Sequence, residues 1–170
     1  MNVMNTPRIE KLVVNIGVGQ SGERLIRAEK LLEKFSSRKP VRTTSKHKIP
    51  VWGLRKGEPI GCKVTIRGED AVELIKRGLY ARDNKLPESC FGDDGNVSFG
   101  VREYIDIQGL KYDPEIGVFG MNFNITLERP GYRLKRRMRL KDKITPKRLV
   151  KQEEALSFMK EKFGVEIEEK

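Results

Sequence analysis

The amino-acid sequence predicts an α+β fold in which an antiparallel sheet has helices packed on one face and leaves the other face open. Several segments alternate apolar and polar residues, while others have the spacing of amphipathic helices. Their order is strand, helix, strand, strand, helix, strand, strand, helix, and it favours an antiparallel sheet covered on one side. We therefore expect the uncovered face to be available to a ligand.

Residues 8–16 and 60–67 are the clearest alternating segments, and each is typical of a half-buried strand. The side chains expected to point inward are Leu12, Val14, Ile16, Ile60, Cys62, Val64 and Ile66, and those expected to point outward include Lys11, Asn15, Lys63 and Thr65. Two long strands are expected at 97–107 and 118–128, and a short one at 40–44.

Helical spacing of apolar residues predicts helices over 23–35 and 69–80. Thr145 and Pro146 resemble the N-cap and first residue of a third helix, which Gly164 would end. A chain of 170 residues has the usual size of one domain. We expect residues 1–128 to form the core domain, and residues 129–170 to form a basic segment and a C-terminal helix packed on or beside it.

Positive charge is concentrated in two windows of the sequence. Residues 36–67 hold nine Lys and Arg against the single acid Glu58, and residues 129–151 hold eleven against Asp142 alone. The net charge of the whole chain is +11, so the remainder is mildly acidic. Because each phosphate neutralised by Lys or Arg releases condensed counterions, nucleic acid is the expected partner. An anionic membrane surface is the alternative, but neither window has the apolar stripe of an interfacial helix.

Other functional classes find little support in the sequence. We expect no metal site and no structural disulfide, because Cys62 and Cys90 are isolated from each other and His47 is the only histidine. No apolar leader or membrane-length apolar run is present, which predicts a cytoplasmic protein. His47 has lysine neighbours and no carboxylate beside it, so no catalytic residue is assigned, and a phosphate contact or a solvated loop position are both open readings.

A literal G-x-G-x-x-G pattern at Gly17, Gly19 and Gly22 offers the sharpest enzyme hypothesis, a dinucleotide site. Such a site needs a second, buried parallel strand ending in an acid about 20 residues later. No acid lies between Glu33 and Glu58. We therefore expect a plain strand-to-helix turn and no cofactor. The alternative is a turn whose backbone amides contact an RNA phosphate.

Trp52, the only tryptophan, lies in the first basic window within a loop rich in Gly and Pro. It is either a stray core residue or a platform on which a base stacks, an interaction worth about 1–3 kcal/mol per base.

Three long stretches, RIEKLVVNIGVG, RKPVRTTSKHKIPVWGLRKGEPIGCKVTIRG and FGDDGNVSFGVREYI, resemble the universal large-subunit ribosomal protein family that binds 5S rRNA, numbered five in bacteria and eleven in eukaryotes. The resemblance runs from about Thr6 to Glu128. The basic segment and helix beyond Glu128 are similar to the archaeal and eukaryotic branch, and the compact length favours the archaeal one.

The resemblance implies a ribosome-bound scaffold of the central protuberance, not an enzyme. Its expected partners are 5S rRNA, large-subunit rRNA, peptidyl-site tRNA and neighbouring ribosomal proteins. The family's contacts to 5S rRNA fall on Lys11, Asn15, Trp52 and Thr65, to which we add Arg38 and Lys63. Arg38 and Trp52 depart from the bacterial pattern, which has Gln and Phe there. The tRNA-facing loop corresponds to residues 44–56, including Lys46, His47, Lys48 and Arg55. We assign large-rRNA contacts to Arg133, Lys135, Arg136, Arg137 and Arg139.

Overall fold

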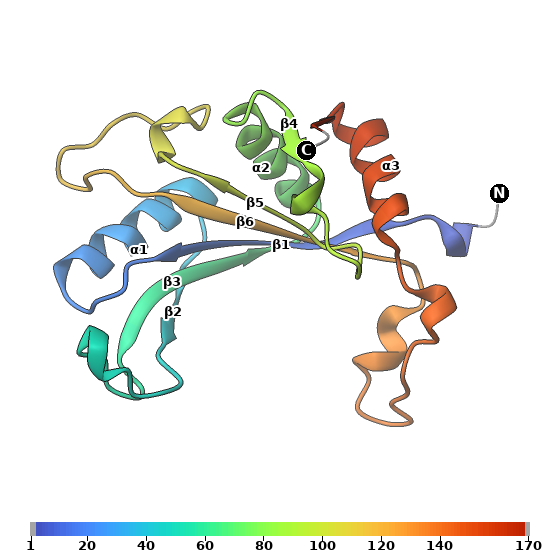
Figure 1. Ribbon diagram of the computed structural model, residues 1–170, viewed down its shortest axis with the longest axis horizontal. Helices are drawn as coiled ribbons and strands as arrows, with labels where there is room; N and C mark the ends of the chain where they lie inside the picture. Colours follow the sequence, from blue (N-terminus) through green and yellow to red (C-terminus); the bar gives the residue numbers. More distant parts are fainter. Residues whose placement is uncertain (1–2, 169–170) are drawn as a thin grey trace.

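The computed structural model describes residues 3–168, apart from the side chains of residues 3 and 147. Its centre is a five-stranded antiparallel sheet in the order β2-β3-β1-β6-β5 (Figure 1). In chain order, the elements are β1 (Arg8–Gly17), α1 (Glu23–Ser36), β2 (Val41–Thr44), β3 (Pro59–Ile66), α2 (Glu69–Tyr80), β4 (Lys85–Pro87), β5 (Val97–Val101), β6 (Met121–Glu128), α3 (Gln152–Phe163) and β7 (Glu166–Glu168). The predicted α+β class is confirmed, and the structure adds two short strands, β4 and β7, to the predicted order of elements.

The core lies between one face of the sheet and the helices. Alternate residues of the three central strands are buried there: Leu12, Val14, Ile16, Cys62, Val64, Ile66, Met121, Phe123, Ile125 and Leu127. From the helices, α1 adds Leu31, α2 adds Ile75 and α3 adds Met159, all without exposed surface. Because all three helices contribute to this one core, they cover a single side of the sheet.

The strands predicted at 97–107 and 118–128 are shorter than expected. β5 ends at Val101 because the chain then turns through a 3-10 helix at Tyr104–Asp106. Tyr104 is buried, and its hydroxyl accepts a hydrogen bond from the amide of Asp113 at 3.0 Å. The predicted strand therefore does not continue past Val101, and Tyr104 packs in the core from the 3-10 helix instead.

The third helix begins later than predicted. Thr145 and Pro146 open a 3-10 turn, and the chain is extended again at Leu149 before α3 starts at Gln152. The extended stretch places the side chain of Val150 in the core. A continuous helix from Thr145 would give Val150 a different position. Gly164, with φ of 65°, ends the helix as predicted. The short parallel pair β4–β7 was not predicted, since three residues are too few for a pattern.

Gly78 provides the closest approach of α2 to the sheet. A Cβ at this position would lie 2.7 Å from the ring of Phe123, which is fully buried and stacks on Phe99. We predict that Gly78→Ala lowers the free energy of unfolding by about 1–2 kcal/mol, because overpacking outweighs the gain in helix propensity. Urea unfolding measures it. Lys76→Ala, on the exposed side of α2, is the matched control, and equal stability of the two variants would contradict the packing described here.

Candidate nucleic-acid interface

The face of the sheet opposite the helices, called here the open face, carries polar side chains in register. Asn15 of β1 pairs with Lys63 of β3 on one side and with Asn122 of β6 on the other. One step along, Val13 pairs with Thr65 and Asn124, and beyond it Lys11 pairs with Thr126. Side chains of paired residues point to the same face, so these positions form rows across neighbouring strands.

Four of the six residues predicted to bind 5S rRNA are brought together on this face. Lys63 and Thr65 are exposed, while Lys11 and Asn15 are half-buried between their neighbours. Among the described residues, the side chains of Asn15, Lys63 and Thr65 have no hydrogen-bond partner. Their donors and acceptors are therefore free to meet a ligand.

Arg38 precedes β2 and is not part of the paired rows on the open face. It follows the end of α1, and its guanidinium is 2.6 Å from the carboxylate of Asp70 at the start of α2. This ion pair holds the Arg38 side chain beside the helical layer.

Residues 45–58, called here the basic loop, join β2 to β3 and have an ordered structure of their own. The amides of Ser45 and Gly57 bond to the carbonyls of Glu58 and Ser45, which closes the base of the loop. Farther out, Ile49 and Leu54 exchange backbone hydrogen bonds of 3.0 and 3.1 Å around a 3-10 turn at Pro50–Trp52. The loop is therefore built to present its tip.

That tip displays apolar and basic side chains. Trp52 is 71% exposed and is not part of the core, so the stray-core reading of this residue is wrong. The four residues predicted to face tRNA, Lys46, His47, Lys48 and Arg55, are all exposed. Trp52 thus belongs to the loop and not to the rows on the open face.

The glycine-rich turn after β1 supports the basic loop. The amides of Val18 and Gly19 both donate to the carbonyl of Ile60, so they are occupied within the protein. The Glu58 carboxylate accepts hydrogen bonds from the Arg55 amide and from the Ser21 hydroxyl. Both bonds lower the pKa of Glu58, and the bond from Arg55 has the larger effect. β1 pairs antiparallel with β3, which is incompatible with the parallel unit of a dinucleotide site.

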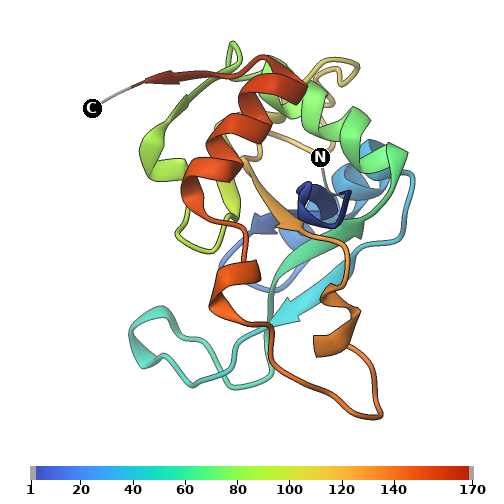
Figure 2. The same ribbon diagram turned by 90° about the vertical axis from the view of Figure 1, so that its right-hand side faces the viewer.

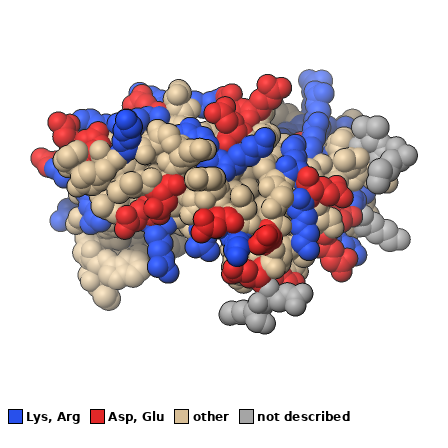
Figure 3. All heavy atoms as spheres, turned by 90° about the horizontal axis from the view of Figure 1, so that it is seen from above, with Lys and Arg blue, Asp and Glu red and all other residues tan. Residues whose placement is uncertain are grey.

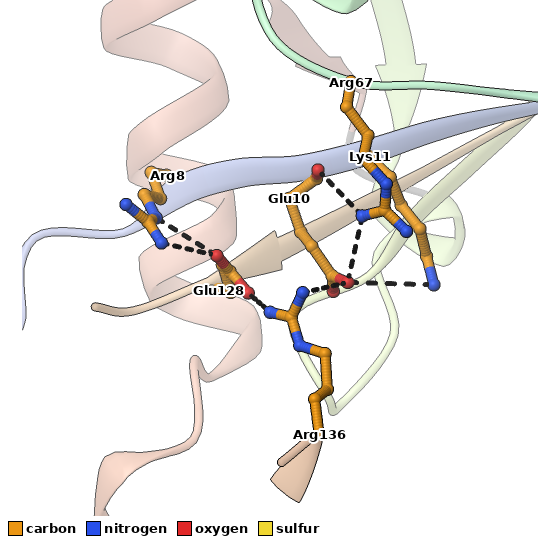
Figure 4. Close-up of polar contacts among 6 residues, drawn as sticks. All are labelled: Arg8, Glu10, Lys11, Arg67, Glu128 and Arg136. Carbon is orange, nitrogen blue, oxygen red and sulfur yellow. Dashed lines mark hydrogen bonds and ion pairs between the residues drawn. The ribbon is translucent and has the colours of Figure 1, made fainter. Parts of the chain in front are cut away.

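Two buried carboxylates collect basic side chains at one end of the open face, as Figure 4 shows. A bulge between Ile9 and Lys11 inserts Glu10, whose carboxylate lies 3.4 Å from Arg67 and 3.2 Å from Arg136. Glu128 bonds Arg8 at 2.8 Å and also pairs with Arg136. Sequence analysis missed this cluster, because a bulge leaves no clear mark in an alternating pattern.

Arg136 comes from residues 129–151, called here the basic segment, and it ties this segment to the sheet. Arg137 is also bound internally, donating to the Leu140 carbonyl at 2.6 Å, and Lys135 lies over the ring of Tyr132. Within the described part of the chain, the side chains of Arg133 and Arg139 have no such partner. Three of the five residues predicted to contact rRNA are thus engaged within the protein, and Arg133 and Arg139 are available to bind RNA.

The two basic projections flank the sheet. The basic loop and the basic segment lie at opposite ends of the molecule in Figure 1, and both extend below the sheet. Figure 2 shows both at the lower end as well, away from α2 and α3. The upper side, by contrast, has Lys and Arg intermixed with Asp and Glu (Figure 3). The sequences of the basic loop and the basic segment contain more Lys and Arg than Asp and Glu.

The arrangement offers little for other chemistry. Cys62 is buried, and this burial raises the pKa of its thiol to about 12. Residues 3–168 contain no group of three His, Cys, Asp or Glu side chains placed to hold a metal ion. None of the helices in this range has the length and apolar character to cross a membrane.

An ordered, polar sheet face between two basic projections has the features of a nucleic-acid-binding scaffold. Comparison with known proteins agrees. A family model described as ribosomal protein L5 matches residues 2–55, and a second model, which describes the C-terminus of the same ribosomal family, matches residues 59–160. The chain therefore belongs to the ribosomal protein L5 family, whose members are structural proteins and not enzymes.

Archaeal relatives cover almost the whole chain. The large ribosomal subunit protein uL5 of Methanosphaera stadtmanae is 51% identical over 99% of this chain and all of the relative. Those of Sulfolobus acidocaldarius and Methanococcoides burtonii are 49% and 45% identical over 98% of this chain, and over 93% and 99% of their own lengths. The predicted family resemblance is confirmed.

Tyr132 clasps the two ends of the basic segment. Its hydroxyl donates to the Arg148 carbonyl at 2.8 Å and accepts from the Val150 amide at 3.2 Å, and burial raises its pKa. We predict that Tyr132→Phe lowers the free energy of unfolding by about 1–3 kcal/mol, since it leaves a buried amide unpaired. Chemical denaturation measures the loss. Tyr112→Phe, at an exposed ring, should change stability by less than about 0.5 kcal/mol. Two equal effects would exclude the clasp.

Proposed function

We propose that this chain is a structural constituent of the large ribosomal subunit and that its open face binds 5S rRNA in the central protuberance. Family membership supports the ribosomal role. The observation that carries the 5S assignment is the row of unpaired polar side chains on a sheet face without helices. Open sheets of this kind suit unstacked bases and RNA backbone. The ribosome-bound protein would act in the cytoplasm.

The proposed 5S surface is centred on Lys11, Asn15, Lys63 and Thr65. Trp52, at the tip of the basic loop, would stack on a base at the margin of this surface. Arg38 would have to exchange Asp70 for a phosphate. Both side chains of that pair are about half exposed or more, so the exchange would cost little.

We further propose that the basic loop contacts peptidyl-site tRNA and that the basic segment contacts large-subunit rRNA. The loop presents Lys46, His47, Lys48 and Arg55 to solvent on an internally bonded frame. Of the five predicted rRNA contacts in the basic segment, Arg133 and Arg139 are available among the described residues, while Arg136 positions the segment.

We also propose that residues 1–128 act as the RNA-binding core domain, with residues 129–170 as its appendage beside neighbouring ribosomal proteins. Arg136 pairs with Glu10 and Glu128 of the core domain, and Val150, Ala155 and Met159 of the appendage are buried in the hydrophobic core. Residues 169–170 lie outside the described range.

The 5S surface is tested by removing its uncharged side chains. We predict that Asn15→Ala and Thr65→Ala each weaken binding to isolated 5S rRNA by about 10-fold, because each loses hydrogen bonds to RNA without opening a cavity. Filter-binding titration measures affinity, and circular dichroism checks the fold. Glu73→Ala, on the exposed side of α2, should bind normally. Unchanged affinity in both open-face variants would count against this surface.

The loop assignment is tested on assembled ribosomes. Replacing Lys46, Lys48 and Arg55 together by Ala should speed tRNA dissociation from the peptidyl site several-fold, because phosphate contacts are lost. Affinity for 5S rRNA should stay within about two-fold of the unmodified protein. A variant with Lys30→Ala, Lys76→Ala and Lys160→Ala, which also loses three positive charges, controls for the loss of charge elsewhere. Dissociation at the normal rate from the triple variant would refute the tRNA contact.

A further inference from the structure

The open face is divided into a charged half and an uncharged half. The charged half carries Lys63 on β3, which has no partner among the described residues, and Lys11 on β1, whose Nζ lies 4.0 Å from the Glu10 carboxylate. Within the strands, the open-face positions of β5 and β6 are neutral until Glu128, namely Ser98, Gly100, Asn122, Asn124 and Thr126, and the exposed Arg102 follows the end of β5. The proposed 5S surface includes no residue of this second half.

Asn122 extends the row that starts at Lys63. Asn15 lies between these two residues, and Gly100 of β5 follows Asn122 at the edge of the sheet. Asn122 is exposed, and none of the described residues bonds to its side chain. The row therefore places a cation, two carboxamides and bare backbone in sequence, with neighbours about 5 Å apart.

Gly100 keeps the space beside Asn122 open. A Cβ at this glycine would lie 3.1 Å from the Asn122 Oδ1, which is tighter than an ordinary contact. Any larger side chain on β5 at this point would crowd the carboxamide and cover its approach. Glycine is disfavoured in strands because it packs nothing, so this position weakens β5 while leaving Asn122 accessible.

Asn124 has a defined orientation in the next row. Its Nδ2 lies 3.5 Å from the carbonyl of Val13, so its amide leans across β1. Val13 is the one apolar side chain in this row, between Asn124 and Thr65. A half-buried apolar spot flanked by hydrogen-bonding groups fits the flat surface and polar edge of a base.

Phosphates and bases are bound by different kinds of side chain. Lys and Arg neutralise phosphates, and their contribution to affinity falls steeply with salt. A carboxamide has no charge, but it offers a donor and an acceptor together, which matches the edge of a base. Unpaired bases expose such edges in single-stranded loops and bulges of RNA.

We propose that the β5–β6 half of the open face reads unpaired bases of the bound RNA through Asn122 and Asn124, while the β1–β3 half holds phosphates. The inference rests on the proposed binding of 5S rRNA and adds to it the part of the surface that gives specificity. On this proposal, the β1–β3 half contributes mainly to affinity, and the β5–β6 half contributes to the recognition of particular bases.

Salt dependence separates the two halves. Affinity for 5S rRNA is measured from about 50 to 300 mM KCl for the unmodified protein and its variants. Asn122→Ala should bind about 10-fold more weakly at every salt concentration, with an unchanged slope of log affinity against log salt. Lys63→Ala should reduce that slope by about one. Gln108→Ala, an exposed amide outside the sheet, is the control and should match the unmodified protein.

A second variant tests whether the weaker binding of Asn122→Ala comes from impaired folding. Gly100→Val adds a residue that favours strands, so β5 should be retained while the approach to Asn122 is blocked. Thermal unfolding checks stability, and affinity should fall about as much as for Asn122→Ala. Dimethyl sulfate probing should show that both variants lose protection of the same base edges in 5S rRNA.

The outcomes distinguish this inference from the function on which it rests. If Asn15→Ala weakens binding but Asn122→Ala and Gly100→Val do not, base reading by β5–β6 is wrong and the 5S surface stands. A lower salt slope in Asn122→Ala, or full base protection despite weaker binding, also overturns it. If the unmodified protein does not bind 5S rRNA, both proposals fail.

Discussion

Two-residue alternation in the central strands is the constraint on which the rest of the structure depends. β1, β3 and β6 each bury every second side chain under the helices, so the intervening residues emerge together on the other side. A slip of one residue in any pairing would bury polar groups and expose the core, which makes the register strongly specified. The same hydrophobic burial that stabilises the fold therefore also fixes which polar groups stand side by side on the open face.

Electrostatic contacts then decide where positive charge is left free. Glu10 and Glu128 have side chains only 8% and 6% exposed, and they absorb the charge of Arg8, Arg67 and Arg136 at one end of the sheet. Among the described residues, the cations without an ion-pair partner include Lys63, those of the basic loop, and Arg133 and Arg139 of the basic segment. A protein with a net charge of +11 can thus bind a polyanion at chosen places instead of over its whole surface.

Patterns of short period could be predicted from the sequence, and contacts between distant segments could not. The inward positions of β1 and β3 and the bounds of α2 follow from local periodicity, and they match the structure. The gathering of Lys11, Asn15, Lys63 and Thr65 also followed, since alternation fixes their face. The pairing of Arg38 with Asp70, the bulge at Glu10 and the late start of α3 depend on tertiary packing, for which no local signal exists.

The central claim, that the open face is covered by RNA, is tested most directly by thiol accessibility. Cysteine is introduced at Asn15 or at Glu73 in a Cys90→Ser background, where buried Cys62 has a pKa of about 12 and reacts slowly. In the free protein both new thiols should react with a maleimide. In assembled large subunits, the thiol of Asn15→Cys should be protected and that of Glu73→Cys should stay reactive. Equal reactivity of Asn15→Cys in both states would contradict the account.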